Sequence, residues 1–335
     1  MSSQKKFKIV ITDCDHPSVE IEKKILNELE PEFILATCRS EDEVIEIAGD
    51  ADGIINQYAP FTSRVIESLQ KCKVICRYGV GVDNIDLEAA TKNKIIVANV
   101  PDYCVDEVST HAMALILACA RKISFLDKKI SNQQWDFTVA KPLFRTQGQT
   151  LGLFGLGRIG RDLARKALGF GFRVIAYDPY VQKTDLEIKL VDFSKLLNDS
   201  DFISIHAPLT AETRYSFSEK ELKAMKKNVY LINTSRGPLV DEQALFKALK
   251  NGWIAGAALD VMEKEPPDWN NPLLKLDNVI ITPHISFYSE ESYIELKTKA
   301  AEAVLAVLKG KIPRSVVNLA VLEKLEGLGG KKRCC

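Results

Sequence analysis

A glycine-rich segment carries the clearest chemical signal in the sequence. Gly155, Gly157 and Gly160 are spaced as GxGxxG, with Arg158 and Ile159 between the last two, and they separate the apolar run TLGLF from a helical pattern. In such a strand–turn–helix segment, the first glycine permits a tight turn, the second admits a pyrophosphate, and the third allows close helix–strand packing. Free N–H groups at the helix N-terminus then bind phosphate oxygens. The segment therefore predicts a dinucleotide site.

An acidic residue, Asp178, ends the next apolar run, RVIAYD. A Rossmann fingerprint has its acid about twenty residues after the glycines, as here. The carboxylate can accept hydrogen bonds from both ribose hydroxyls and would repel a 2′-phosphate, which favours NAD over NADP. The glycines could instead be simple turn residues and Asp178 a strand-end cap. The complete order of strand, glycines, helix, strand and acid favours the cofactor interpretation.

Further distinctive residues follow nearly every strand-like run in this half of the chain. Ligands of open parallel sheets bind beyond the carboxyl ends of the strands, so such a row indicates one sheet edge carrying a site. Each residue alone could equally be a surface or loop residue. Besides the glycine segment and Asp178, we predict as cofactor contacts His206, Ala207, Pro208, Thr213, Thr234, Ser235, Arg236, Asp260 and His284.

The elements that would position these residues alternate between strand and helix. Apolar strand-like runs occur at 7–12, 33–36, 53–56, 73–78 and 95–99, and again at 150–154, 173–178, 202–206, 229–233, 254–260 and 278–282. This rhythm predicts an α/β protein with two parallel-sheet domains, Rossmann-like and flavodoxin-like, and a cleft between them. Ser40 followed by Glu43 predicts a capping box at the start of one helix.

Two long helical patterns suggest how the domains are connected. The stretch 105–122 lacks proline and glycine and predicts one uninterrupted helix at a domain crossover, and the stretch after Glu290 predicts a return. We therefore predict a discontinuous, flavodoxin-like substrate domain formed by 1–102 and 293–335. Residues 103–292 would form the NAD-binding Rossmann domain.

Composition excludes several other classes of protein. Lysine plus arginine and aspartate plus glutamate both number 45, whereas a general nucleic-acid binder usually has a basic excess. No apolar run reaches membrane-spanning length, and the N-terminus lacks a signal core. The eight cysteines are best interpreted as free thiols in a reducing compartment, and no Cys/His cluster predicts a metal. We expect a cytoplasmic protein without a nucleic-acid or membrane partner.

The blocks GLGRIG, HAPLT, NTSRGPLVDE, ALDVMEKEP and TPHIS occur in this order and resemble the D-isomer-specific 2-hydroxyacid dehydrogenases. RYGVGVDNID and NVP upstream fit the same family, and the GVGVDNID and HxxxYS patterns look nearest to its C-terminal binding protein branch. The resemblance implies hydride transfer between NAD(H) and a small D-2-hydroxy or 2-keto acid, such as glyoxylate, hydroxypyruvate or 3-phosphoglycerate. The alternative is an NAD(H)-sensing corepressor or scaffold of the C-terminal binding protein type.

The resemblance assigns the catalytic roles to Arg236, Glu265 and His284. Imidazole titrates near the working pH, so His284 would exchange the proton of the substrate oxygen. Glu265 would bond the other ring nitrogen and fix the tautomer. Arg236 would hold the substrate carboxylate and polarise the carbonyl. Taken without the family, Glu265 is more simply a solvated surface residue.

The predicted substrate contacts from the first domain are the backbone N–H groups of Val80 and Gly81, with Tyr78 nearby. Residues that could set substrate preference are Asn56, Gln57, Tyr58, Phe61, Phe287 and Tyr288, although core packing explains each equally well.

The resemblance also implies a homodimer in which 123–149 forms an arm. Trp135 and Phe137 on this arm are either dimer anchors or core residues. The C-terminal KKRCC is either a prenylation signal or an unmodified end, and we favour the latter.

Overall fold

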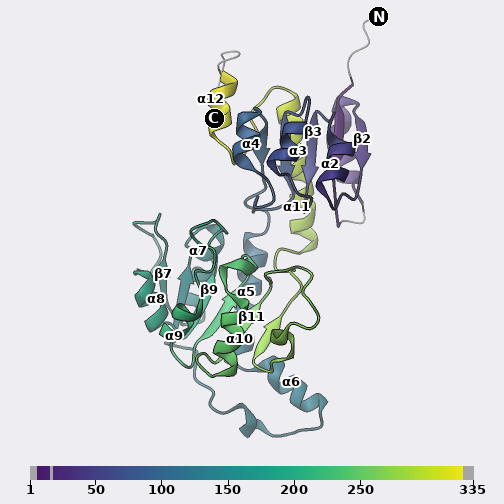
Figure 1. Ribbon diagram of the computed structural model, residues 1–335. Helices are drawn as coiled ribbons and strands as arrows, with labels where there is room; N and C mark the ends of the chain where they lie inside the picture. The colour runs from purple at the N-terminus through teal and green to yellow at the C-terminus, as the bar shows by residue number, and fades with distance from the viewer. Residues whose placement is uncertain (1–5, 16–17, 327–335) are drawn as a thin grey trace, which may run out of the picture. The chain divides into compact units, whose positions relative to one another are not determined.

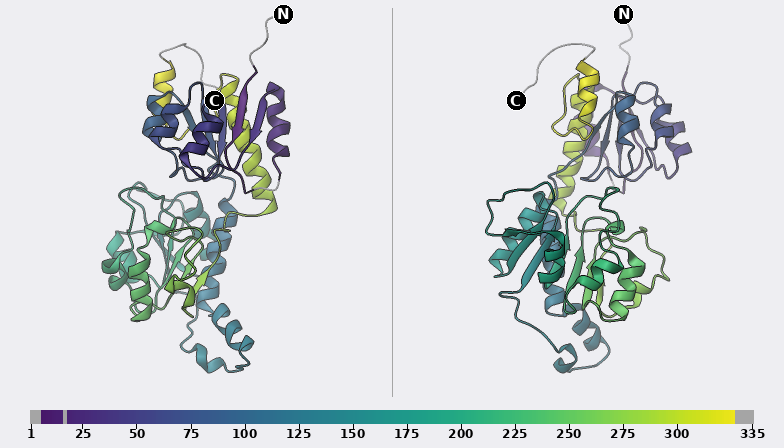
Figure 2. Two further views of the ribbon diagram at one scale, coloured as in Figure 1. Left: turned by 45° about the vertical axis from the view of Figure 1, so that its right-hand side comes forward. Right: turned by 60° about the vertical axis from the view of Figure 1, so that its left-hand side comes forward.

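The computed structural model describes residues 6–15 and 18–326. The chain divides into two compact units, one formed by Met1–Tyr103 with Ser289–Cys335 and the other by Cys104–Tyr288. Each unit contains one parallel sheet with packed helices (Figures 1 and 2). The predicted class, two parallel-sheet α/β domains, is confirmed.

The first unit has a five-stranded parallel sheet in the order β2-β1-β3-β4-β5, which is the flavodoxin-like arrangement. Val10, Ile54, Ile75 and Val97 are register partners across β1, β3, β4 and β5, and all four are buried in one apolar cluster. Its strands are β1 (Lys8–Ile11), β2 (Glu32–Leu35), β3 (Gly53–Asn56), β4 (Val74–Arg77) and β5 (Ile96–Ala98).

Short helices connect these strands, and a long helix returns from the second unit. They are α1 (Glu20–Leu26), η1 (Asn27–Leu29), α2 (Glu41–Ala48), α3 (Ser63–Ser68), α4 (Leu87–Lys92), α11 (Glu290–Leu308) and α12 (Ala320–Glu326). The predicted capping box is confirmed: the Ser40 hydroxyl accepts from Glu43 N–H, and the Glu43 carboxylate accepts from Ser40 N–H.

The second unit has a seven-stranded parallel sheet in the order β12-β11-β10-β9-β6-β7-β8, which extends the Rossmann arrangement by one strand. Ile203, Leu231, Ala257 and Val279 are register partners across four strands and share one apolar cluster. The strands are β6 (Thr150–Phe154), β7 (Arg173–Tyr177), β8 (Lys189–Leu190), β9 (Phe202–Ile205), β10 (Tyr230–Asn233), β11 (Gly256–Leu259) and β12 (Val279–Ile281). The sequence predicts six of them, because the two-residue edge strand β8 leaves no apolar run.

Helices cover both faces of this sheet, since residues of α5 and α7 share one apolar cluster and residues of α8, α9 and α10 share another. The elements are α5 (Val105–Ala120), α6 (Ile123–Ser131), η2 (Phe137–Ala140), α7 (Arg158–Gly169), α8 (Phe193–Asp199), α9 (Glu219–Ala224), η3 (Gly237–Leu239), α10 (Glu242–Lys250) and η4 (Pro272–Lys275). The long apolar helix predicted at 105–122 is thus observed as α5.

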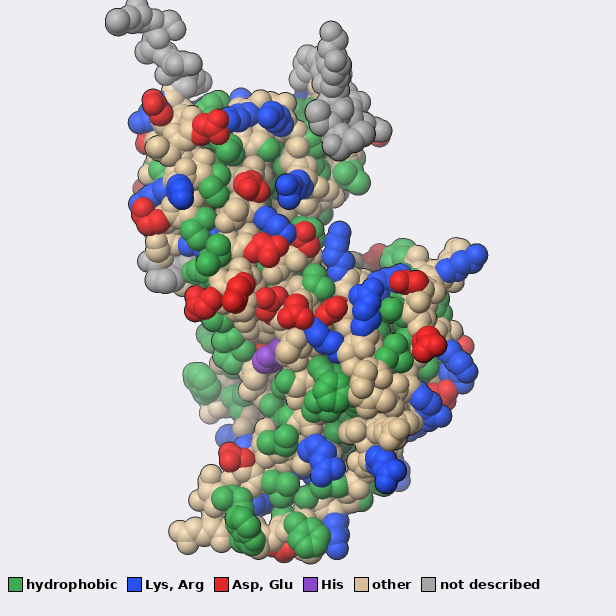
Figure 3. Space-filling view, turned by 180° about the vertical axis from the view of Figure 1, so that it is seen from behind, with side chains coloured by type: hydrophobic (Ala, Val, Ile, Leu, Met, Phe, Trp, Pro, Cys, Tyr) green, Lys and Arg blue, Asp and Glu red, His purple; other side chains and the backbone are tan. Residues whose placement is uncertain are grey.

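An arm containing α6 and η2 follows α5 and extends away from the sheet of its own unit (Figures 1 and 2). Lys122 has a left-handed backbone, with φ of 52°, which turns the chain between α5 and α6. Trp135 is 91% exposed and Phe137 76% exposed, so neither is a core residue of the single chain. Figure 3 shows hydrophobic side chains gathered at the end of the unit where the arm lies.

The six described cysteines are all free, as expected, and five of them are buried. Within residues 6–15 and 18–326, the helices are too short or too polar to cross a membrane. The same residues contain no group of three or more His, Cys, Asp or Glu side chains placed to hold a metal ion. The KKRCC end lies outside the described residues.

Candidate active site

The glycine segment forms the turn between β6 and α7. Gly155 has a φ of +101°, and a Cβ there would lie 2.7 Å from the backbone nitrogen of Ala207. A Cβ on Gly160 would lie 2.4 Å from the carbonyl oxygen of Gly155. By contrast, nothing stands within 4 Å of a Cβ on Gly157, which occupies the N-cap position of α7 without a side-chain cap. The turn therefore leaves open space over a helix N-terminus, which fits a pyrophosphate.

Asp178 lies beside this turn, immediately after β7. One of its carboxylate oxygens accepts the N–H of Leu156 at 2.8 Å, and the other accepts the N–H of Tyr180 at 2.9 Å. The carboxylate thus ties the glycine turn to the end of β7. This placement matches the ribose-binding acid of the dinucleotide fingerprint.

The segment after β9 is held against the neighbouring strand ends. His206 Nε2 lies 2.8 Å from Ser204 Oγ, and burial lowers the pKa of His206 to about 4, so its ring is neutral near pH 7. The Thr213 hydroxyl donates to the carbonyl of Pro208 at 2.7 Å, and the Ser235 hydroxyl donates to the carbonyl of Ala207 at 3.0 Å. These contacts shape the HAPLT turn.

Thr234, which directly follows β10, has a buried hydroxyl oxygen without a hydrogen-bond partner among the described residues. A buried polar atom of this kind is costly to leave unsatisfied. It lies at the edge of the sheet where the glycine turn and Asp178 also lie, and a bound dinucleotide is polar enough to satisfy it. Together with the open glycine turn, it makes the residues present fit NAD.

His284 and Glu265 form a close pair of titratable side chains at this edge. His284 Nδ1 lies 2.6 Å from Glu265 Oε2, and Glu265 Oε1 accepts the N–H of Met262 at 2.9 Å. Since the carboxylate accepts, Nδ1 carries the proton, and Nε2 of the neutral ring is left as a proton acceptor. Both side chains are partly exposed, 27% for His284 and 34% for Glu265. The structure therefore places the predicted pair in contact.

Arg236 follows β10 and precedes η3. The Asn233 amide donates to the carbonyl of Arg236 at 2.8 Å, and its oxygen accepts the N–H of Ser235 at 3.0 Å. Gly237 permits the close approach of the next loop, because a Cβ there would lie 2.0 Å from the carbonyl carbon of Met262. Asn233, which sequence reasoning missed, therefore shapes the turn that carries Arg236. The only signal in the sequence for Asn233 is that a polar residue ends an apolar strand.

The sequence predicts Asp260 as a cofactor contact. In the structure, its carboxylate binds groups of the protein. Its carboxylate is 1% exposed and accepts the N–H groups of Ile285 at 3.0 Å and Ser286 at 2.9 Å. The Thr282 hydroxyl donates to the same carboxylate at 2.6 Å. The carbonyl of Asp260 accepts the N–H of His284 at 2.8 Å. Asp260 therefore binds the loop that carries His284 from both sides.

Tyr78, predicted near the substrate, is 2% exposed, and its hydroxyl donates to Glu22 at 2.6 Å. Burial raises its pKa well above the usual value. The following loop begins at Gly79, with φ of +136°, and the Asn99 amide donates to the carbonyl of Val80 at 2.6 Å. The side chain of Tyr78 thus anchors the loop internally. Val80, on the loop after Gly79, is exposed, whereas Tyr78 is not.

The other candidates for substrate preference in the first unit differ in exposure. Asn56, Gln57 and Phe61 are buried, whereas Tyr58 is 43% exposed. Asp13 organises this segment by accepting the N–H of Gln57 at 3.1 Å and that of Tyr58. Core packing thus explains three of the four side chains. Tyr58 is the one that is accessible.

Comparison with known proteins decides the family. Residues 113–286 match the profile of the "D-isomer specific 2-hydroxyacid dehydrogenase, NAD binding domain". The chain is 38% identical over 317 residues to a glyoxylate reductase of Korarchaeum cryptofilum, a match covering 91% of this chain and 95% of that protein. The chain belongs to the D-isomer-specific 2-hydroxyacid dehydrogenase family. The predicted family, NAD as its cofactor, and an NAD-dependent oxidoreductase as its enzyme class are confirmed.

Two further proteins similar to this chain carry the names of related dehydrogenases. The dehydrogenase is 44% identical to D-3-phosphoglycerate dehydrogenase of Methanocaldococcus jannaschii over 93% of its own length, but this match spans 59% of that longer protein. Its fold matches a D-lactate dehydrogenase of Aquifex aeolicus, solved with NAD and lactic acid, with a TM-score of 0.83 and 29% identity. That match covers 97% of this chain and 100% of the other. Assignment to the C-terminal binding protein branch stays a prediction.

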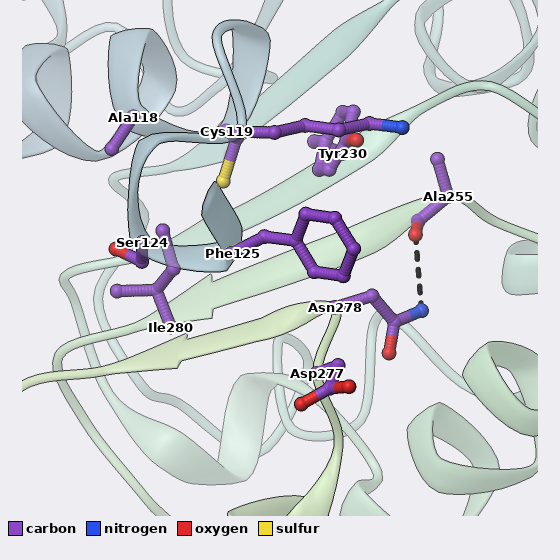
Figure 4. Close-up of a pocket in the computed structure, with 10 residues that line it drawn as sticks. Ala118, Cys119, Ser124, Phe125, Tyr230, Ala255, Asp277, Asn278 and Ile280 are labelled. Carbon is purple, nitrogen blue, oxygen red and sulfur yellow. Dashed lines mark hydrogen bonds between the residues drawn. The ribbon is translucent and has the colours of Figure 1, made fainter. Parts of the chain in front are cut away.

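A hollow of about 190 Å³ lies at the opposite edge of the second sheet (Figure 4). Cys119, Phe125, Tyr230 and Ile280 line it, from α5, α6, β10 and β12. Tyr230 is the first residue of β10, so the hollow faces the amino ends of the strands. It therefore does not belong to the site built by the strands' carboxyl ends.

Proposed function

We propose that this dehydrogenase interconverts a small 2-keto acid and its D-2-hydroxy acid, with Arg236, Glu265 and His284 as its catalytic residues. The contact between His284 Nδ1 and Glu265 Oε2, at 2.6 Å, carries this proposal. Because Nδ1 is taken up by this contact, Nε2 of the partly exposed imidazole is left for a substrate. The ring lies at the sheet edge whose residues fit NAD. The three residues follow three adjacent strands, β10, β11 and β12.

In the direction of reduction, bound NADH supplies the hydride for carbon 2 of the keto acid. His284 in its protonated form donates the Nε2 proton to the substrate oxygen, so the keto group becomes a hydroxyl. Glu265 stabilises the positive charge on the ring before this transfer and keeps Nδ1 protonated throughout. Arg236 binds the substrate carboxylate by charge-assisted hydrogen bonds and draws electron density from the carbonyl. Oxidation reverses each step.

For the cofactor, we propose that the N-terminus of α7 binds the pyrophosphate and that Asp178 binds the ribose hydroxyls. The open space at Gly157 and the uncapped helix support the first assignment. A 2′-phosphate would meet the negative charge of Asp178, which supports a preference for NADH. We propose that His206 lines this site as a neutral ring.

For the substrate, we propose glyoxylate, hydroxypyruvate or 3-phosphohydroxypyruvate. A glyoxylate reductase and a hydroxypyruvate reductase, each 38% identical to this chain, support the first two acids, and the 44% identical D-3-phosphoglycerate dehydrogenase supports the third. Initial rates with NADH and with NADPH, measured against these three acids and pyruvate, test substrate and cofactor together. Absence of turnover with every acid, despite tight NADH binding, would contradict the enzyme and favour the scaffold alternative.

We further propose a cytoplasmic homodimer formed through the arm. Trp135 and Phe137 expose large apolar surface on a segment that leaves its own sheet, and burial of such surface drives association. Free buried thiols fit a reducing compartment. Light scattering tests the assembly: the wild type should have the mass of a dimer and the double variant Trp135→Ser, Phe137→Ser that of a monomer. A monomeric wild type at micromolar concentration would contradict it.

A further inference from the structure

A line of hydrogen bonds connects α5 to the loop that carries His284. His111, on α5, has its Nε2 atom 3.0 Å from the hydroxyl oxygen of Thr282, which follows β12. The Thr282 hydroxyl lies 2.6 Å from Oδ1 of Asp260. Asp260 in turn accepts the N–H groups of Ile285 and Ser286. The two ends of this line, His111 and the His284 loop, are far apart in the sequence.

The direction of each hydrogen bond follows from the chemistry of the groups. The Asp260 carboxylate accepts two backbone N–H groups, so it acts as an acceptor toward Thr282 as well. Thr282 therefore donates its single hydroxyl proton to Asp260. It has only acceptor capacity left for His111, which must carry a proton on Nε2. The hydrogen bonds thus run one way, from His111 through Thr282 to Asp260, and His111 Nε2 itself lies 3.7 Å from Oδ1 of Asp260.

The loop at the end of this line needs external support. His284 has a left-handed backbone, with φ of 52°, a conformation that costs a residue other than glycine of order 1 kcal/mol or more. Its N–H is bonded to the carbonyl of Asp260, and the next two N–H groups are bonded to the carboxylate. Asp260 is therefore the clamp that holds the His284 backbone in this conformation. Contacts that hold the Asp260 side chain in place therefore also help to hold the backbone that carries the imidazole.

We propose that His111 and Thr282 are positioning residues for the dehydrogenase reaction, acting on His284 through Asp260. Thr282 supplies a donor that fixes Oδ1 of Asp260, and His111 fixes the rotamer of the Thr282 hydroxyl. Neither side chain transfers a proton to the substrate. This inference rests on the proposed role of His284 as the proton donor.

Isosteric and donor-retaining variants separate positioning from simple packing. Thr282→Val keeps the shape and removes the hydroxyl, whereas Thr282→Ser keeps the hydroxyl. His111→Leu removes the donor, whereas His111→Gln retains an N–H at the same number of bonds from Cα. We expect Thr282→Val and His111→Leu to lower kcat about tenfold, the effect of losing one hydrogen bond to a charged network. Thr282→Ser and His111→Gln should recover most of that loss.

The readouts must distinguish this role from loss of stability. The dissociation constant of NADH and the KM of the keto acid should stay within about twofold of the wild type, because the hydride acceptor and cofactor sites are untouched. The deuterium isotope effect with 4-deuterated NADH should rise, since a misplaced acid slows the chemical step. Thr150→Val is the matched control: Thr150 is a buried threonine, 6% exposed, at the first residue of β6 and thus at the opposite sheet edge. Its kcat should equal that of the wild type.

Three results would overturn the inference. The first is a kcat equal to that of the wild type in Thr282→Val or in His111→Leu. The second is a loss of kcat in Thr282→Ser as large as that in Thr282→Val. The third is a parallel loss in Thr150→Val, which would show that general destabilisation lowers kcat. His284→Ala, measured beside them, tests the proposed function separately. Retained turnover in His284→Ala would refute the proton donor itself, whereas an inactive His284→Ala with a normal Thr282→Val would refute only the positioning role.

Discussion

Glu265 Oε2 lies 2.6 Å from His284 Nδ1, on the side of the ring away from the nitrogen that would face a substrate. The same carboxylate is itself held by the N–H of Met262 at 2.9 Å, so the ring is oriented by a group with a fixed position. This arrangement separates two tasks. In the proposed mechanism, one ring nitrogen serves for orientation and charge stabilisation, and the other for proton transfer.

His284→Ala should fold normally, bind NADH with wild-type affinity, and lose turnover by about 10²- to 10⁴-fold, the usual contribution of a general acid. The side chain is 27% exposed, so its removal leaves little cavity. Stopped-flow rates and NADH fluorescence titration measure both quantities. Near-wild-type turnover would rule out His284 as the proton donor.

Glu265→Gln removes the negative charge beside the imidazole while keeping an oxygen that can accept from Nδ1. We expect kcat to fall about 10- to 100-fold, because the protonated ring loses its charge partner. Because Glu265 would act only through His284, the double variant with His284→Ala should be no slower than His284→Ala alone. Additive losses in this cycle would mean that Glu265 has an independent role.

Asp178→Ser should weaken the preference for NADH over NADPH by about tenfold or more, measured as the ratio of the two kcat/KM values. The serine no longer repels a 2′-phosphate, and it provides a single oxygen in place of the two that bind Leu156 and Tyr180. Asp185→Asn is the control, since Asp185 is a mostly exposed acid, 76%, paired with Arg161. An unchanged ratio in Asp178→Ser would exclude Asp178 as the discriminating residue.

The lowered pKa of His206 predicts that the free energy of unfolding depends on pH. Burial lowers the pKa of this ring to about 4 from its usual value of 6.5, so between these two pH values the unfolded chain binds a proton that the folded chain does not. Stability is therefore fully present above about pH 6.5 and is lost as the pH falls toward 4, by on the order of 3 kcal/mol from this group.

His206→Gln retains a nitrogen at the position bonded to Ser204 but does not titrate. Its free energy of unfolding should therefore fall less than that of the wild type between pH 7 and pH 5. Urea unfolding of both proteins at the two pH values measures the difference. Equal pH dependence in the two proteins would show that His206 is solvated in the folded chain.

Tyr78→Phe should destabilise the protein by about 1–3 kcal/mol, because Oε1 of the fully buried Glu22 would lose its donor while Oε2 keeps its ion pair with Lys297 at 3.5 Å. If the loop of Val80 and Gly81 binds the substrate carboxylate, the KM of the keto acid should also rise while NADH affinity stays constant. Tyr180→Phe is the control, at a tyrosine that is 93% exposed. Wild-type stability in Tyr78→Phe would show that Glu22 finds another donor.

The sequence by itself determined the strand–helix alternation, the capping box at Ser40 and the glycine turn at Gly155–Gly160. These features depend on neighbouring residues: periodic burial, a cap three residues from its partner, and glycines at fixed offsets. Residues at the carboxyl ends of the strands could also be predicted to share one edge, because all strands of such a sheet run in the same direction.

Only the tertiary structure decided which of those edge residues touch each other. Asp260 and Thr282 meet because β11 and β12 are adjacent in the sheet, and His111 joins them because α5 packs on the same sheet. The sequence predicts Tyr78 near the substrate, and only the structure shows that its hydroxyl donates to Glu22 on α1 inside the fold. Side-chain partners of this kind depend on strand order and helix packing, which bring distant segments together and leave no local pattern in the sequence.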